Sequence, residues 1–514
     1  MSHIASRKQF SRNLASGWVL LAAEILVAFS LTPFIILKLG AAAYGVWSLM
    51  IGVIGYMGLV DVGLRGSVGR YINHYLARAE SRALNEVVST SFAVLTGLAL
   101  IAGLLAIGLA ENFQTVFPKT PPELLDDIRV SLPLLALGLW LSFVSAILGN
   151  LLSAKEAMYL ANGFGLLTLA ARTGGVVWVL LNGHGIVGLV LVNLAASLLS
   201  NALMIWTVRR VFGHQTPRVF GFSRERLFEM WRFGIASFIS RTASTMANDS
   251  APIIGMWILG PEAVAIYSVA LTLTQNARRL QDLANAAIFP SVMRAGALRD
   301  MAGLRALYLR FMDISFAIGS LVFIALIVFS GDFLNLWVGH QYASGAAVIS
   351  ILSIGYLLQG IASTGPLALQ SLDRIGVTVK IGIAESVACV ALTALLPGMF
   401  GLGLLGMALG STIPRLVSNL ALYPPLSIDA MGDELKRLLP RAIGRNLLIC
   451  VGVGAAFSGL HFLLPGHSWP TMIASISIAC TMHLLLMAMC YEGLPVIGVI
   501  TDRLRRRLLG QVQI

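Results

Sequence analysis

Two stretches of this sequence, LGAAAYGVWS at residues 39–48 and LGPEAVAIYS at residues 259–268, align at one fixed offset. Each lies at the turn between the first and second of six consecutive apolar segments. The equivalent positions favour a duplicated six-helix unit over chance similarity between apolar stretches. Duplicated units of this kind build two lobes around a central cavity that can open to either side of a membrane. A weaker match in the fourth segment of each set pairs Leu135 and Gly138 with Leu352 and Gly355.

The composition predicts an integral membrane protein. With 57% hydrophobic residues, 12% charged residues and a mean hydropathy of +0.83, the chain has too little charge to cover a water-facing surface. The net charge of +12 could suggest nucleic acid, but the basic residues are spread over loops expected beside anionic lipid headgroups. No CxxC or CxxH spacing occurs, so neither a disulfide framework nor a metal site is expected. The four cysteines, all in apolar segments, are Cys389, Cys450, Cys480 and Cys490.

Fourteen apolar segments are long enough to cross a bilayer, for which a helix needs about 20 residues. The predicted fold class is therefore an all-α polytopic membrane protein with about 14 transmembrane helices. The connections are too short to fold as separate soluble domains. The predicted spans are 14–37, 43–64, 84–110, 130–152, 159–181, 186–208, 231–259, 262–292, 311–329, 346–371, 377–396, 403–422, 447–464 and 472–491.

The basic residues also predict how the chain is oriented. They concentrate before the first span and after the second, sixth, eighth, twelfth and fourteenth, whereas the other set of connections holds only Lys38, Lys119 and Arg129. Because basic loops stay in the cytoplasm, both termini are expected inside and residues 111–129 outside. We predict an N-terminal lobe over 1-215, a C-terminal lobe over 216-430, and a helix pair with a basic cytoplasmic tail over 431-514.

Ten ionisable residues fall within the predicted spans. A charge at the bilayer centre costs about 2.5–3.5 kcal/mol on insertion scales, so such residues usually face a cavity or a partner. Polar neighbours at helical spacing, such as Asn248 near Arg241, favour the cavity. The alternatives are a simple pair between Arg278 and Asp282, and a Lys380 side chain that extends to the inner surface. The ten are Glu24, Arg172, Arg241, Asp249, Arg278, Arg279, Asp282, Lys380, Glu385 and Arg415.

The basic majority among these residues suits an anionic ligand, because arginine grips phosphate through two parallel hydrogen bonds. The predicted substrate-binding residues are Arg172, Arg241, Arg278, Arg279 and Arg415. The carboxylates Glu24, Asp249 and Glu385 could offset these arginines, or could carry a proton or a sodium ion if burial raises their pKa. No other cofactor and no catalytic residue is expected.

Several stretches resemble a known family. The run LGAAAYGVWSLMIGVIGYMGLVDVGLRGSVGRYI at 39–72, the motif FLNLWVG at 333–339 followed by Tyr342-Ala343, and the loop Leu372-Asp373-Arg374 resemble bacterial polysaccharide transporters. These belong to the multidrug/oligosaccharidyl-lipid/polysaccharide exporter superfamily, which includes O-antigen flippases and the lipid II flippase. The resemblance implies two pseudo-twofold-related six-helix lobes, alternating access, polyprenyl-pyrophosphate-linked sugars as cargo, and a bacterial inner membrane. The last helix pair resembles that of the fourteen-span members, and in the lipid II flippase such a pair helps to accommodate the lipid tail.

Three functions compete. The first is a flippase that turns a lipid-linked saccharide from the inner to the outer leaflet, with membrane lipids, a polysaccharide polymerase and other assembly proteins as further partners. The second is a drug or ion antiporter of the same superfamily, for which an organic cation would favour a cavity dominated by carboxylates. The third is a polytopic glycosyltransferase or polymerase, but the sequence shows no nucleophile–base pair and no phosphate-cradling glycine loop on a connection. The flippase is therefore the predicted function, and no enzymatic activity is expected.

Overall fold

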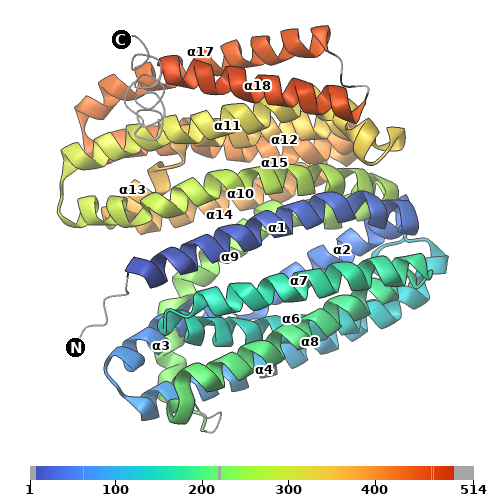
Figure 1. Ribbon diagram of the computed structural model, residues 1–514, viewed down its shortest axis with the longest axis vertical. Coiled ribbons are helices and arrows are strands. Elements are labelled where there is room, and N and C mark those ends of the chain that lie inside the picture. The colour runs from blue at the N-terminus through green and yellow to red at the C-terminus, as the bar shows by residue number, and fades with distance from the viewer. Residues whose placement is uncertain (1–6, 62, 218–220, 465, 467, 491–514) are drawn as a thin grey trace, which may run out of the picture. The chain divides into compact units, whose positions relative to one another are not determined.

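The computed structural model describes residues 7–61, 63–217, 221–464, 466 and 468–490, and throughout these ranges it is built of helices and short connections (Figure 1). The chain divides into two compact units. The first comprises residues 1–269 and 382–411, and the second comprises residues 270–381 and 412–514. Three helices, α10 (Pro261–Ala297), α14 (Ile375–Gly398) and α15 (Gly403–Val417), contribute residues to both units.

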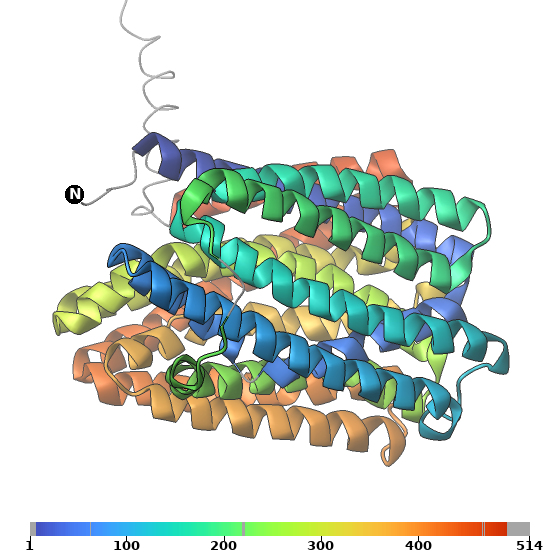
Figure 2. The ribbon, with the colours of Figure 1, turned by 90° about the horizontal axis from the view of Figure 1, so that it is seen from below.

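In the first unit, long apolar helices pack side by side. Helix α6 lies between α4 and α8, and α7 packs against both α8 and α1 (Figures 1 and 2). Helix α9 packs against α2, α3 and α4. The helices of this unit are α1 (Arg7–Leu39), α2 (Ala41–Met57), η1 (Gly58–Asp61), α3 (Leu64–Ala77), α4 (Ser81–Glu111), α5 (Phe113–Val116), η2 (Pro122–Leu124), α6 (Leu125–Ala154), α7 (Met158–Leu181), α8 (Gly185–Phe212), η3 (Gly213–Gln215) and α9 (Arg224–Ile258).

The second unit is organised around one long helix, α11, which packs against α12, α17 and α18 (Figure 1). The C-terminal pair is fastened to α11 by polar contacts, since Asp313 accepts hydrogen bonds from Arg445 and Asn446. The helices are α11 (Met301–Trp337), η4 (His340–Tyr342), α12 (Gly345–Gln359), η5 (Gly360–Ala362), α13 (Gly365–Ser371), the π-helix η6 (Ser418–Leu422), α16 (Tyr423–Met431), α17 (Asp433–Leu463) and α18 (Trp469–Cys490).

The two repeated sequence stretches form matching turns in the first unit. Gly40 separates α1 from α2 with φ of +80°, and Gly260 separates α9 from α10 with φ of +102°. Only glycine adopts such a conformation without strain, so the shared Leu-Gly dipeptide has a local physical cause. The turns also meet, because a Cβ atom at Gly45 would collide with the backbone carbonyl of Pro261.

The predicted all-α, polytopic fold is confirmed. Each of the fourteen predicted spans coincides with one helix or with adjoining helices, the last as far as Cys490. Within the described ranges, nine helices are long and apolar enough to cross a membrane, and two shorter apolar helices accompany them. Helices α9 and α10 are long, at 35 and 37 residues, but too polar to be counted among the nine.

Some predictions on organisation remain untested. The division at residues 215 and 430 stays a prediction, as does the cytoplasmic placement of both termini. Part of the basic pattern on which that placement rests, Arg218 and the tail with Arg503, Arg505, Arg506 and Arg507, lies outside the described residues.

Candidate functional site

Two of the predicted arginines meet on one aromatic ring in the second unit. The guanidinium carbon of Arg415 on α15 lies 4.9 Å from the centroid of the Tyr356 ring, and that of Arg278 on α10 lies 5.3 Å from it. Both distances are within the range of cation–π attraction. The two guanidinium carbons are therefore within about 10 Å of each other. The second unit therefore brings two of the predicted arginines together among its helices.

Tyr356 is held firmly in its position. It lies on α12, is only 1% exposed, and stacks on Phe323 of α11 with ring centroids 5.8 Å apart. Its neighbour Gly355 allows α15 to approach, because a Cβ atom there would come within 2.7 Å of the Thr412 side chain. The ring thus packs against α11, and the helix that carries it is approached closely by α15.

Arg415 lies where the regular helix is interrupted. Pro414 precedes it and cannot donate a backbone hydrogen bond, and the π-helix from Ser418 to Leu422 begins three residues later. The Asn419 side chain donates to the Arg415 carbonyl at 2.8 Å. Short π-helical segments occur often at functional sites, where they change the direction of side chains. Arg415 is 5% exposed, which makes it a deeply buried charge in the second unit.

The alternative pairing of Arg278 is also present. Its Nε atom lies 3.6 Å from the Asp282 carboxylate, one helical turn along α10. Arg278 is partly buried, whereas Asp282 and the neighbouring Arg279 are exposed. Arg278 therefore contacts a carboxylate and an aromatic ring at once, and its ion pair with the exposed Asp282 is weakened by solvent.

The other predicted residues lie in the first unit. Glu24 on α1 is close enough to Arg172 on α7 to attract its charge, and the two helices pack along each other. Arg241 is exposed on α9. Asn248, predicted to share its face, is held within the helix by hydrogen bonds to Ser244. The side chain of Ser237, which precedes Arg241 by four residues and is expected on the same face, lies outside the described residues.

Two carboxylates predicted to couple ions also lie in this unit. Asp249 on α9 faces the glycine side of α2, with its carboxylate 3.9 Å from where a Cβ atom of Gly55 would lie. Glu385 on α14 is half-buried. The adjacent Ser386 donates to the Ala243 carbonyl at 2.7 Å and so ties α14 to α9. The binding and coupling roles of all these residues stay predictions.

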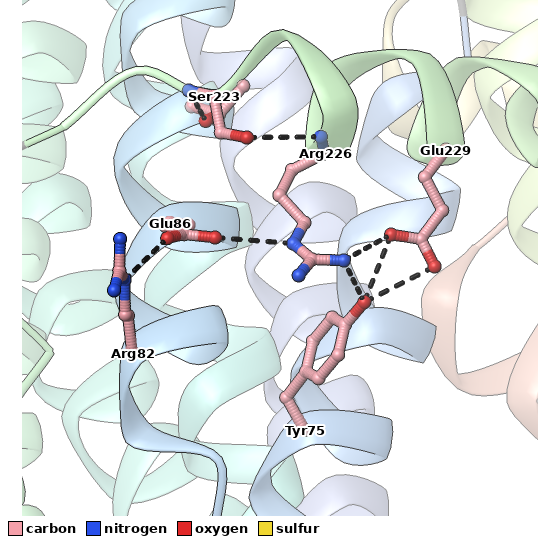
Figure 3. Close-up of polar contacts among 7 residues, drawn as sticks. Tyr75, Arg82, Glu86, Ser223, Arg226 and Glu229 are labelled. Carbon is pink, nitrogen blue, oxygen red and sulfur yellow. Dashed lines mark hydrogen bonds and ion pairs between the residues drawn. The ribbon is translucent and has the colours of Figure 1, made fainter.

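One polar cluster was not predicted from the sequence. Ser223 caps α9 and so places Arg226 one turn into the helix. Figure 3 shows the Arg226 guanidinium between the carboxylates of Glu86 and Glu229, at 3.3 and 3.0 Å. The Tyr75 hydroxyl accepts from Arg226 at 2.7 Å and donates to Glu229 at 3.0 Å. The cluster joins the start of α9 to α3 and α4.

This environment shifts two pKa values. Burial, together with the hydrogen bond and negative charge of Glu229, raises the pKa of Tyr75 to about 12. Burial opposes the charge on Arg226, but the hydrogen bonds it donates to Glu229 and Glu86 outweigh this and raise its pKa. Only the spacing of Arg226 and Glu229 by three residues could have been noticed in the sequence.

A polar cavity of about 560 Å³ borders this cluster. It combines charged side chains of both signs with two aromatic rings, and the Tyr71 hydroxyl donates to the Glu229 carbonyl at 3.2 Å. The lining residues are Arg70, Tyr71, Glu225, Arg226, Phe228, Glu229 and Arg232.

Comparison with known proteins identifies the family. The sequence profile described as "Polysaccharide biosynthesis protein" matches residues 14–295, more than half of the chain. The chain belongs to this family. The resemblance noted in the sequence is thus confirmed, and the protein is a multi-pass membrane protein of the polysaccharide biosynthesis family.

Three relatives each match most of the chain. It is 24% identical over 407 residues to a "Putative O-antigen transporter" of Shigella flexneri, covering 78% of this chain and 94% of the relative. It is 22% identical over 451 residues to a "Probable flippase AglR" of Haloferax volcanii, and the match covers 84% of this chain and 86% of that relative. It is also 22% identical over 473 residues to the "Uncharacterized membrane protein EpsK" of Bacillus subtilis, and the match covers 91% of this chain and 92% of that relative.

Solved structures share the fold. The lipid II flippase MurJ, in an inward closed conformation, is similar with a TM-score of 0.71 and 11% identity, covering 93% of this chain and 98% of MurJ. A multidrug resistance MATE family transporter of the MOP superfamily, in an inward-facing conformation, is similar with a TM-score of 0.69 and 16% identity. The match covers 80% of this chain and 96% of that transporter. At these identities the similarity establishes the fold alone.

Proposed function

We propose that the protein is a flippase that carries a polyprenyl-pyrophosphate-linked oligosaccharide from the inner to the outer leaflet of the bacterial cytoplasmic membrane. The observation that carries the proposal is the meeting of Arg278 and Arg415 on the Tyr356 ring. Two guanidinium groups brought together in this way suit an anionic ligand, and a pyrophosphate is such a ligand. The relatives described as an O-antigen transporter and a flippase support this class of cargo.

The chemistry of the head group explains why arginine serves this role. Each guanidinium presents a planar fork of N–H donors that matches two phosphate oxygens. The charged head of the lipid would bind these donors while its polyprenyl tail stays in the surrounding lipid. Alternating access, in which the two lobes expose the site first to one side and then to the other, would release the head group outside.

Glu24, Asp249 and Glu385 are proposed for a different role. They would couple transport to protons or sodium ions, because a carboxylate inside the protein can exchange a cation as its surroundings change. Polysaccharide polymerase and other assembly proteins are proposed as partners that receive the product on the outer side.

The second candidate function is export of small organic molecules coupled to an ion. The shared fold of the multidrug transporter is compatible with it. An organic cation would be bound best by carboxylates, whereas the site in the second unit brings two arginines onto one aromatic ring. The third candidate, a polysaccharide polymerase or glycosyltransferase, is disfavoured because two of the relatives are described as a transporter and a flippase.

The test compares Arg278→Ala and Arg415→Ala with Arg437→Ala in cells that depend on the protein. Arg437 is an exposed arginine of the same unit and serves as the matched control. The first two variants should accumulate lipid-linked oligosaccharide in the inner leaflet while the protein is present at normal abundance. Unchanged lipid intermediates in both variants would contradict the proposal. Increased drug sensitivity with normal intermediates would favour the second function.

A further inference from the structure

We propose that an apolar cavity in the first unit binds one acyl chain of an anionic membrane phospholipid, whose phosphate is held by Arg209. The inference goes beyond the proposed function and does not depend on it. The cavity has a volume of about 240 Å³ and is lined by α4, α6 and α8, of which α6 packs against the other two. Its lining is apolar except for Arg209 and Thr216, so it suits a hydrocarbon chain that ends in a negative charge.

The cavity runs along one face of α6. The side chains that α6 contributes recur at spacings of three and four residues, which places them on one side of the helix. They extend from Val144 to Leu151 and therefore over about 10 Å of the helix axis. The apolar wall is completed by Val88 and Phe92 of α4 and by Ile205 and Val208 of α8. The cavity is thus an elongated apolar slot that accommodates part of an acyl chain.

The charged end of the cavity lies where its helices end. Leu151 precedes the end of α6 by three residues, and Arg209 precedes the end of α8 by three residues, whereas Val144 lies two turns deeper. Beside this end, the guanidinium carbon of Arg210 lies 4.2 Å from the ring centroid of the exposed Trp206. Tryptophan and arginine side chains gather where the bilayer meets water, so Arg209 is expected at the level of the lipid headgroups.

Arg209 selects for a negative charge. It is exposed, and its side chain makes no hydrogen bond or ion pair with any residue that the structure describes. The other polar lining group, the Thr216 hydroxyl, donates to the Gly213 carbonyl at 2.7 Å. The guanidinium fork can therefore bind two oxygens of a phosphate. A phospholipid with a net negative charge suits both ends of the cavity, whereas in a zwitterionic lipid the cation beside the phosphate opposes Arg209.

The test is photolabelling of the whole chain in phosphatidylcholine nanodiscs. The probe is phosphatidylglycerol with a diazirine near the middle of one acyl chain, and its affinity is read from labelling against its mole fraction. Cross-links should map to the inner part of the cavity, at Phe92, Val144 or Leu148, and unlabelled phosphatidylglycerol should displace the probe. Arg209→Gln should lower the affinity roughly fivefold, as expected for one hydrogen bond to a charged group that solvent partly screens.

Matched variants test both ends of the cavity. Arg210→Gln removes a neighbouring arginine outside the cavity and should change the affinity by less than about twofold. Val144→Phe places a larger side chain in the cavity and should reduce labelling at Leu148. Leu199→Phe, on an exposed part of α8 outside the cavity, should leave that labelling unchanged. If Val144→Phe does not accumulate, the two arginine variants alone decide the result.

Three outcomes would overturn the proposal. Equal affinities of Arg209→Gln and Arg210→Gln would mean that anionic lipid is attracted generally to the basic surface and not bound at this cavity. Cross-links spread evenly over the exposed faces of the helices would mean that the acyl chain does not enter the cavity. Displacement of the probe by a polyprenyl phosphate, but not by phosphatidylglycerol, would assign the cavity to the tail of a polyprenyl lipid instead.

Discussion

Arg226→Ala is the substitution whose cost can be worked out most directly. Arg226 donates to Glu86, Glu229 and the Tyr75 hydroxyl at 2.7–3.3 Å, and its side chain is only 20% exposed. A hydrogen bond to a charged group contributes about 1.5–3 kcal/mol when buried, whereas an exposed ion pair contributes about 0–1 kcal/mol. Because Glu86 is 27% exposed, we discount the buried value and expect a loss of about 2 kcal/mol.

The chain offers a matched control for this prediction. Arg82 pairs with the same Glu86 at 3.2 Å, but its side chain is 95% exposed. Arg82→Ala should therefore change stability by less than about 0.5 kcal/mol. Both variants would be measured by reversible unfolding of the purified protein in mixed micelles of a mild detergent and sodium dodecyl sulfate. A double-mutant cycle of Arg226 with Glu86 should show a coupling of about 1 kcal/mol.

The result that would refute this reasoning is equal stability of Arg226→Ala and Arg82→Ala. It would mean that partial burial in this cluster does not strengthen its ion pairs. A coupling near zero between Arg226 and Glu86, with Arg226→Ala still destabilising, would instead assign the effect to packing of the Arg226 guanidinium on the Tyr75 ring, whose centroid lies 4.9 Å away.

Three further predictions concern Tyr75, Arg241 and the three carboxylates. The pKa of Tyr75 is raised from 10.0 to about 12 in the folded state. The stabilisation by the protonated Tyr75 hydroxyl is therefore complete below pH 10 and is lost as the pH rises toward 12. Tyr75→Phe should reduce this loss of stability at alkaline pH in unfolding measurements. Arg241→Ala should abolish surface polysaccharide at normal protein abundance, and Arg241→Lys should restore only part of it, because an ammonium lacks the planar fork; a fully active alanine variant would exclude phosphate binding by this residue. Neutralising Glu24, Asp249 or Glu385 should alter the pH or sodium dependence of transport measured in vesicles, and unchanged dependence in all three would leave them as structural residues.

The resemblance to polysaccharide transporters was visible in the sequence because its motifs lie at turns. Residues 39–48 and 259–268 keep the same Leu-Gly dipeptide, and Gly40 and Gly260 both adopt a positive φ. A turn of this kind depends on the chemistry of one residue, so it can be recognised without knowing the fold. The candidate site was only partly predictable: Arg278 and Arg415 could be selected as charges within apolar segments, but not as neighbours.

The sequence by itself determined that this is a polytopic helical membrane protein, and which segments form its helices. These properties depend on local composition, because a run of about 20 apolar residues is stable in lipid only as a helix that satisfies its own backbone hydrogen bonds. Tertiary structure alone decided that Arg226 meets Glu86, 140 residues away, and that Tyr356 lies beneath two arginines. In an apolar segment Tyr356 has the pattern of any core residue, since periodicity gives the face of a helix but not the helix that it contacts. Which side chains meet is set by the packing of helices distant in sequence, and a buried charge acquires its partners only when that packing forms.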